Sequence, residues 1–204
     1  MPSCRARATP SSRWPEAVIA RRPLLLAALA SPLGAARAAD AEALLRAGGV
    51  VIAFRHALAP GTFDPPGFKV GDCSTQRNLS DEGRAQARRI GEWFAQRTLK
   101  PERVRSSPWC RCIDTATLAF GAPEIDATLG SPRGYSEATN AESLRALRRS
   151  LAAASKRTGR FEVWVTHMFV LSALTGEGSS SGEGLVLRAR ASGDPEVLAR
   201  LAIA

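Results

Sequence analysis

Two short apolar runs constrain the fold of this chain more than any other feature of its sequence. Val50–Phe54 (VVIAF) and Phe161–Val165 (FEVWV) consist mainly of apolar residues that favour β-strands. Runs without regular polar alternation are typical of strands that are covered on both faces, as in a parallel sheet between two layers of helices. The chain has only two histidines, His56 and His167, and each closely follows one of these runs.

The segments around these runs alternate between helical and strand patterns. Ser80 followed by two acidic residues predicts a helix start, and the spacing of Ala87, Ile90 and Phe94 predicts the buried face of that helix. The other predicted elements are a helix over 41–48, a strand over 102–107, a helix with Ser107 as N-cap, Pro108 as first residue and Gly121 just past its end, a helix over 141–155, a short helix to Leu174, and a final antiparallel pair that turns at 192–194. This alternation predicts an α/β fold, a three-layer α/β/α sandwich with a mainly parallel central sheet.

The first 38 residues resemble an export signal rather than part of a folded domain. Five arginines lie in the first 22 residues, and the apolar stretch that follows ends at Ala36-Arg37-Ala38, which fits the small-x-small cleavage pattern. The pair Arg21-Arg22 partly resembles a twin-arginine signal. We therefore expect residues 1–38 to be a signal peptide, residues 39–204 to form a single domain, and the mature protein to be exported to a bacterial periplasm.

Removing this segment changes the charge of the chain. Residues 1–38 contain six Arg and one Glu, a net charge of +5, so +4 of the formal +9 remains on residues 39–204. The strong basicity is thus largely a property of the signal, which argues against a nucleic-acid partner, while mild basicity still favours an anionic ligand. The sequence has no run of eighteen or more uncharged apolar residues, so we expect no stable membrane insertion after signal cleavage.

Basic side chains are expected to meet at one edge of the predicted sheet. Ligands of open α/β sheets bind at the carboxyl ends of the strands, and the two runs place Arg55, His56 and His167 there. Arg111 falls in the first turn of a predicted helix, whose N-terminal amides favour an anion. Taken alone, each of these residues more often has a structural role. Two histidines, two arginines and a helix N-terminus together, however, could bind a tetrahedral phosphate.

Four sequence blocks together resemble the histidine phosphatase (phosphoglycerate mutase-like) superfamily. They are FRHA, QRNLSDEGRAQA, VRSSPWCRCIDTA and VTHMFVLSALTG, and they occur in the expected order between roughly residues 50 and 176. The resemblance implies that His56 is the nucleophile that accepts phosphate and that Arg55 and Arg111 bind the phosphoryl oxygens. It also implies that His167 completes the pocket, where a protonated imidazole would add a cationic donor. Neither a metal ion nor another cofactor is implied.

Two departures from the family pattern leave the proton donor open. Ala57 replaces the usual glycine of the RHG triplet, and Met168 replaces the aspartate that follows the second histidine in the acid phosphatase branch. The chain therefore resembles the smaller mutase-like branch, in which a glutamate after the Arg111 block is typically the acid. The leading candidate is Glu137, and the alternatives are Glu124, Asp126, Glu142 and, in the first loop, Asp64. Any one of these carboxylates is more often a solvated surface group.

Three cysteines remain after Cys4 is removed with the signal. Cys73 lies in the long loop after the first run, and Cys110 and Cys112 flank Arg111, so both segments should border the same pocket. In an oxidising compartment we expect Cys73 to pair with either Cys110 or Cys112, which leaves one thiol free. A zinc site is disfavoured because the Cys-x-Cys spacing is short and both histidines are assigned elsewhere.

These features predict a metal-independent phosphatase that hydrolyses phosphate monoesters through a phosphohistidine intermediate. Little room for a cap lies between Arg111 and His167, so the substrate could be small or a macromolecule such as a phosphoprotein or a glycan phosphate. A mutase, which must exclude water, is disfavoured. No GxxxxGK[ST] sequence is present, which argues against ATP-driven transfer. The alternative is an exported protein that keeps the pocket and binds phosphorylated ligands without hydrolysing them.

Overall fold

The structure is a computed structural model that describes residues 32–132 and 136–203 of the chain. The helices are α1 (Pro32–Ala47), α2 (Asp81–Gln96), α3 (Cys110–Phe120), α4 (Glu137–Ala154) and α5 (Met168–Thr175), with short 3-10 helices η1 (Cys73–Thr75) and η2 (Ala127–Leu129). The strands are β1 (Val50–Arg55), β2 (Arg103–Ser106), β3 (Glu124–Ile125), β4 (Phe161–Thr166), β5 (Gly184–Ala189) and β6 (Pro195–Leu201). The predicted twin-arginine pair and most of the predicted signal peptide lie outside the described residues, and export stays a prediction.

The six strands of the described residues form one sheet, in the order β3-β2-β4-β1-β5-β6. β1 pairs in parallel with β4, and β2 pairs in parallel with β3 and β4, whereas β5 is antiparallel to both β1 and β6. The two apolar runs are therefore central neighbours, and the mainly parallel sheet that they predict is confirmed, as is the antiparallel pair at the end of the chain. The register places Arg55 opposite Thr166, so His56 and His167 follow at the same edge of the sheet.

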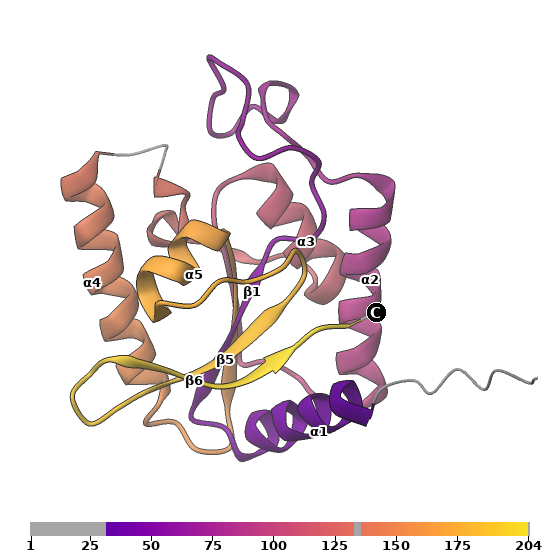
Figure 1. The fold of residues 1–204 in the computed structure, drawn as a ribbon, viewed down its shortest axis with the longest axis vertical. Helices are drawn as coiled ribbons and strands as arrows, with labels where there is room; N and C mark the ends of the chain where they lie inside the picture. The colour runs from indigo at the N-terminus through magenta and orange to yellow at the C-terminus, as the bar shows by residue number, and fades with distance from the viewer. Residues whose placement is uncertain (1–31, 133–135, 204) are drawn as a thin grey trace, which may run out of the picture. The chain divides into compact units, whose positions relative to one another are not determined.

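Helices cover both faces of this sheet, as the unbroken apolar runs predict. Val50, Ile52 and Phe54 belong to a core cluster shared with α1, α2 and α3. Val51 and Ala53 belong to a second cluster, shared with α4 and α5. Because alternate residues of a strand point to opposite faces, a strand in the middle layer must be apolar on both. In Figure 1, α2 and α3 lie on one side of β1 and α4 and α5 on the other.

α2 has the cap and the buried stripe that the sequence predicts. The Ser80 hydroxyl accepts a hydrogen bond of 3.1 Å from the backbone N–H of Gly83, which caps the first turn. Ala87, Ile90 and Phe94 are buried. A Cβ on Gly83 would lie 2.0 Å from the carbonyl oxygen of Leu58, so only glycine allows the helix to approach the loop after β1 this closely.

The start of α3 differs from the prediction. The helix begins at Cys110, and Trp109 is its N-cap, so the prediction of Ser107 as N-cap and Pro108 as first residue is wrong. The Ser107 hydroxyl lies instead 2.8 Å from Nε2 of His167. This contact joins residues that are 60 positions apart, and it competes with the local capping role that the sequence suggests.

α1 and α4 begin earlier than predicted. α1 covers the expected boundary between the signal peptide and the domain, and Ala41 and Leu45, which follow that boundary, are buried in the core. α4 begins at Glu137 rather than at residue 141, because the Ser136 hydroxyl accepts a hydrogen bond from the backbone N–H of Thr139. No helix in the described ranges is long and apolar enough to cross a membrane.

The long loop predicted after the first run connects β1 to α2. Apart from η1 and an isolated bridge between Lys69 and Asp72, it has no regular secondary structure. It projects beyond the carboxyl end of β1 (Figure 1). Cys73 of this loop forms a disulfide with Cys110, which confirms one of the two predicted pairings, and Cys112 is the buried free thiol.

Candidate active site

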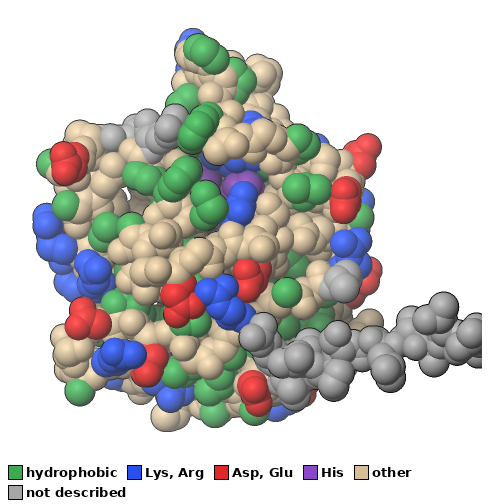
Figure 2. Space-filling model, in the orientation of Figure 1, with side chains coloured by type: hydrophobic (Ala, Val, Ile, Leu, Met, Phe, Trp, Pro, Cys, Tyr) green, Lys and Arg blue, Asp and Glu red, His purple; other side chains and the backbone are tan. Residues whose placement is uncertain are grey.

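A pocket of about 420 Å³ opens at the carboxyl ends of β1 and β4. Its lining includes all four residues that the sequence singles out, which are Arg55, His56, Arg111 and His167. Two charged residues of the long loop, Asp64 and Arg77, also line it. Figure 2 shows the histidines in a hollow of the surface, with side chains of Lys or Arg beside them.

His56 is held in one orientation and one tautomer. Its backbone N–H donates to the carbonyl of Thr166, and its Nδ1 lies 2.8 Å from the carbonyl oxygen of Ala57. A carbonyl can only accept, so Nδ1 carries the proton and Nε2 keeps its lone pair. Burial lowers the pKa of His56 to about 3; the bond to Ala57 opposes this, and the charges of Arg111, Arg77 and Arg55 add to it. The imidazole is therefore neutral, the form a nucleophile requires.

His167 is also neutral, so it does not bring to the pocket the positive charge that a protonated imidazole would add. Its ring centre lies 5.6 Å from that of His56 and its side chain is almost fully buried. A guanidinium nitrogen of Arg111 lies 3.4 Å from Nδ1, which must accept, so the opposite nitrogen carries the proton and donates to the Ser107 hydroxyl. Burial, followed by the charge of Arg111, holds the pKa of His167 well below its usual range.

Three arginines share the pocket, one more than the sequence analysis assigns to it. Arg55 ends β1, Arg111 lies in the first turn of α3 as predicted, and Arg77 comes from the long loop. Among the described residues, the Nε–H groups of all three are buried and have no hydrogen-bond partner. A buried donor without a partner is costly, and more so on a charged group. Three such donors around one pocket suit an anion that has several acceptor oxygens.

Arg77 is the site residue that the sequence analysis missed. It lies in the block QRNLSDEGRAQA, which carries part of the family resemblance but by itself gives Arg77 no role. Its position in a loop gives no periodic signal, and its place at the pocket depends on contacts distant in sequence. Its guanidinium donates to the carbonyl of Ala59, and its carbonyl accepts from Arg111 at 3.4 Å.

Asp64 is the one carboxylate that lines the pocket in the described ranges, and both of its oxygens accept hydrogen bonds. It accepts two hydrogen bonds from Arg111, at 2.7 and 3.2 Å, one from the Trp109 indole at 3.2 Å and one from the backbone N–H of Arg77 at 3.0 Å. Burial raises the pKa of Asp64, but the hydrogen bonds from Arg111 and Arg77 and the charge of Arg111 outweigh it and hold the pKa below its usual value. The carboxylate is therefore ionised and orients Arg111.

The other candidate acids do not line the pocket. Glu137, the leading candidate, is exposed at the start of α4. Glu124 pairs with Arg103, and its side chain is more than half exposed. The remaining two candidates are also paired, Asp126 with Arg105 and Glu142 with Arg145 and Arg149. The structure thus brings only Asp64 of the five candidates to the histidines.

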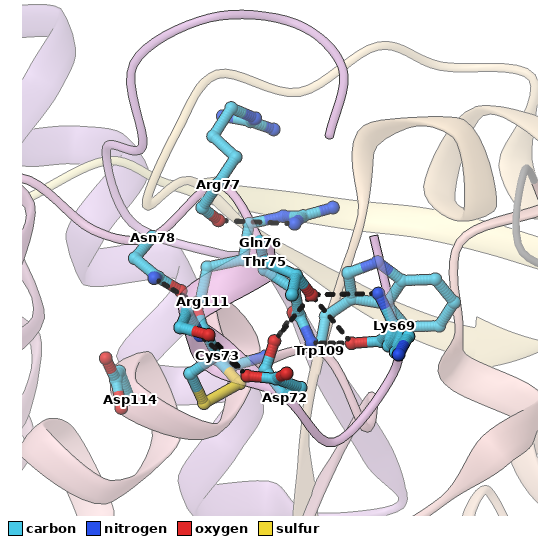
Figure 3. Close-up of a disulfide and its surroundings, with 12 residues drawn as sticks. Lys69, Asp72, Cys73, Thr75, Gln76, Arg77, Asn78, Trp109, Arg111 and Asp114 are labelled. Atoms are coloured by element: carbon cyan, nitrogen blue, oxygen red, sulfur yellow. Dashed lines mark hydrogen bonds between the residues drawn. A yellow bond between two sulfur atoms is a disulfide. The ribbon is translucent and has the colours of Figure 1, made fainter. Parts of the chain in front are cut away.

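The disulfide fastens the loop to the helix that carries Arg111 (Figure 3). Beside the Cys73–Cys110 bond, the backbone N–H of Cys110 donates to the Gln76 side chain at 3.0 Å, and Asn78 donates to the Cys73 carbonyl at 2.7 Å. Arg77 lies between these two anchored residues. The bond therefore fixes the segment that supplies the third arginine.

Breaking this disulfide is expected to destabilise the domain. A bond that closes 37 positions restricts the unfolded chain, and its removal is expected to cost about 2–4 kcal/mol of unfolding free energy. Urea unfolding of the double variant Cys73→Ser, Cys110→Ser against the wild type measures this. Adding a reductant should lower the stability of the wild type to that of the variant and leave the variant unchanged. Equal stabilities without reductant would contradict the prediction.

The free Cys112 does not contribute a nucleophile. Burial raises the pKa of its thiol to about 12, although the charge of Arg111 opposes this. Its sulfur lies 3.6 Å from Nε2 of His167 and 3.6 Å from the carbonyl of Thr166, and its side chain is fully buried. No group of three or more His, Cys, Asp or Glu side chains in the described ranges is arranged to hold a metal ion.

Comparison with known proteins finds a family model that matches part of the chain and solved structures that share its fold. The model of the histidine phosphatase superfamily (branch 1) matches residues 71–130, which contain Arg77 and Arg111 but neither histidine. No curated protein matches the sequence. Among solved structures, the chain is similar to the protein histidine phosphatase SixA complexed with tungstate, with 18% identity, a TM-score of 0.53, and coverage of 75% of this chain and 96% of that chain.

Two further solved structures show the same likeness. The product of the open reading frame Rv3214 of Mycobacterium tuberculosis has 15% identity and a TM-score of 0.54, with 72% of this chain and 94% of that chain covered. The alpha-ribazole phosphatase of Shigella flexneri has 11% identity and a TM-score of 0.54, with 75% and 96% covered. Identities this low show a shared fold only. With the family model matched over residues 71–130 and the fold shared, the resemblance of this chain to the phosphoglycerate mutase-like histidine phosphatase superfamily is confirmed.

Proposed function

We propose that the protein hydrolyses phosphate monoesters through a phosphohistidine formed on His56. The main support is the pairing of a buried neutral imidazole, whose Nδ1–H is bound to the Ala57 carbonyl, with three arginines that have buried, unpartnered Nε–H groups. The relatives reported above include phosphatases, which supports the same reaction class. Because SixA and the ribazole enzyme are named for different substrates, no single substrate is carried over to this chain.

In the first step, the Nε2 lone pair of His56 attacks phosphorus, a P–N bond forms and the P–O bond to the alcohol breaks. The alcohol leaves with the electron pair of that bond and takes up a proton. Arg55, Arg77 and Arg111 donate to the phosphoryl oxygens, on which negative charge is spread in the transition state. In the second step, water attacks phosphorus and gives up a proton to the solvent, the P–N bond breaks with its electron pair returning to Nε2, inorganic phosphate leaves and the imidazole returns to its neutral form.

The leaving alcohol has no evident proton donor among the described residues. Asp64 is ionised and bound to Arg111, and none of the other candidate carboxylates lines the pocket. A reaction without an acid depends on how stable the departing anion is. This supports a preference for substrates whose leaving group has a low pKa. It also keeps the second candidate function open, an exported protein that binds phosphorylated ligands without hydrolysing them.

Hydrolysis of aryl phosphates tests the proposal. The protein is expected to hydrolyse 4-nitrophenyl phosphate in the presence of a chelator, and to do so at least about tenfold faster than phenyl phosphate, whose leaving phenol has a pKa of ~10. Vanadate, which can mimic five-coordinate phosphorus, should inhibit. Activity that disappears in the chelator and returns with a divalent ion would contradict the proposal. Vanadate binding without any hydrolysis would support the binding protein instead.

A further inference from the structure

The pocket is much larger than a phosphate group. Its volume is about 420 Å³, whereas a phosphate has five heavy atoms and takes the space of a few water molecules, which occupy ~30 Å³ each. On the proposed function, the phosphoryl group binds beside His56 and among Arg55, Arg77 and Arg111, which are here called the arginine end of the pocket. Most of the pocket therefore remains for the alcohol part of the substrate.

Six apolar side chains also line the pocket and are here called the apolar collar. The collar consists of Phe63, Pro65, Pro66 and Phe68 from the long loop and Met168 and Phe169 from the start of α5. Phe63 is 48% exposed and Phe169 is 38% exposed. Only four large apolar side chains in the described ranges are exposed, and these two both line the pocket. Exposed aromatic side chains that gather at one site mark a binding surface.

Charge in the pocket disfavours a cationic alcohol part. In the described ranges the lining includes no Lys and no Glu, and its single carboxylate, Asp64, is already paired with Arg111. An ammonium group that entered the collar would lose its hydration without gaining a free carboxylate. An aromatic or aliphatic group loses little and gains contact with the collar.

The loop half of the collar is held in place before any ligand binds. Asp64 lies between Phe63 and Pro65 and is fixed by hydrogen bonds to Arg111 and to the Trp109 indole. Phe68 packs on the Trp109 ring, with 6.0 Å between ring centres. A surface that is already ordered loses less entropy on binding.

We propose that the apolar collar selects monoesters whose alcohol carries an aromatic ring close to the phosphate. The inference rests on the proposed function, because it takes the arginine end as the phosphate site. The ring would lie between Phe63 and Phe169, and the phosphoryl group would reach Arg55, Arg77 and Arg111.

Non-hydrolysable phosphonates test this separately from catalysis. Calorimetry with the protein is expected to show that benzylphosphonate binds at least about tenfold more tightly than methylphosphonate, because the ring buries apolar area in the collar. In the variants Phe63→Ala and Phe169→Ala the ratio of the two affinities should fall to less than about threefold. Ile125→Ala is the matched control, since Ile125 is 54% exposed but does not line the pocket, and it should keep the wild-type ratio.

The outcomes separate this inference from the proposed function. Equal affinities for the two phosphonates, or 2-aminoethylphosphonate binding as tightly as benzylphosphonate, would overturn the aromatic preference and leave the phosphate site intact. No binding of either phosphonate would contradict the phosphate site, and the inference with it. If an alanine variant fails to fold, Phe63→Leu and Phe169→Leu remove the ring while keeping an apolar side chain, and the ratio should still fall.

Discussion

Replacing His56 with alanine is expected to lower kcat for 4-nitrophenyl phosphate by at least about 10³-fold, since removal of a catalytic nucleophile commonly costs this much or more. His56 is neutral, and its Nδ1 is bound to the Ala57 carbonyl, so Nε2 is the atom that can attack phosphorus. Alanine offers no such atom. The same change leaves Arg55, Arg77 and Arg111 in place, so the affinity for benzylphosphonate should fall far less than kcat.

Several measurements distinguish a lost nucleophile from a lost fold. The variant should keep the circular dichroism spectrum of the wild type and should still bind vanadate. The wild type, stopped with alkali during turnover, should carry phosphate that is stable to base and labile to acid, as a P–N bond is. The variant should carry none. Activity of His56→Ala within about tenfold of the wild type, a loss of only ~1.4 kcal/mol in transition-state stabilisation, would contradict the nucleophile assignment.

The sheet, and the edge of it at which both histidines lie, were predictable because they depend on the local pattern of apolar residues. A strand in the middle of a three-layer sandwich must be apolar on both faces, and Val50–Phe54 meets that requirement with every residue buried. Once both runs are strands of one parallel sheet, topology alone places His56 and His167 at its carboxyl edge. The cap of α2 at Ser80 was likewise readable from residue type and position, whereas for the partner of Cys73 the sequence left Cys110 and Cys112 as alternatives, of which the structure shows Cys110.

Features that depend on distant contacts were not predictable in the same way. Ser107 has the residue type of an N-cap, yet its hydroxyl lies at His167 because β2 and β4 are neighbours in the sheet. Arg77 and Asp64 come from a loop without periodicity. Asp64 is held by its ion pair with Arg111, and Arg77 by the hydrogen bond that its carbonyl accepts from Arg111 and by the nearby Cys73–Cys110 bond; none of these contacts leaves a local signal in the loop.

The family resemblance singled out four residues that lie together in the fold, but its leading candidate for the acid lies elsewhere. It identified Arg55, His56, Arg111 and His167, which all line one pocket. It favoured Glu137 as the acid because members of that family typically use a glutamate in that part of the chain, whereas Glu137 here is exposed at the start of α4. The position of Glu137 after the Arg111 block in the sequence does not determine where α4, which begins at Glu137, lies relative to the pocket.

The second large effect concerns the stability of the fold in mild acid. Both histidines are buried, and burial is the largest cause that lowers the pKa of His56 to about 3 and the pKa of His167 well below its usual range. The charges of Arg111, Arg77 and Arg55 act on both in the same direction. In the unfolded chain each histidine has its ordinary pKa of ~6.5. Below that pH the unfolded chain binds protons that the folded protein does not, so the folded state loses stability as pH falls.

Urea unfolding at about pH 7.5 and about pH 5, in buffers without phosphate, tests this expectation. Over that interval His56 alone should lower the unfolding free energy by about 2 kcal/mol, and His167 should lower it further. Asp64 does not interfere, because the pKa of its carboxyl is already below the ordinary ~3.9 and its contribution is lost only at lower pH. His56→Asn and His167→Asn should each reduce the pH dependence, since each removes one of the protons taken up on unfolding. If both variants keep the wild-type pH dependence, the histidines titrate in the folded protein as they do in the unfolded chain. The conclusion that the buried His56 is neutral would then be wrong.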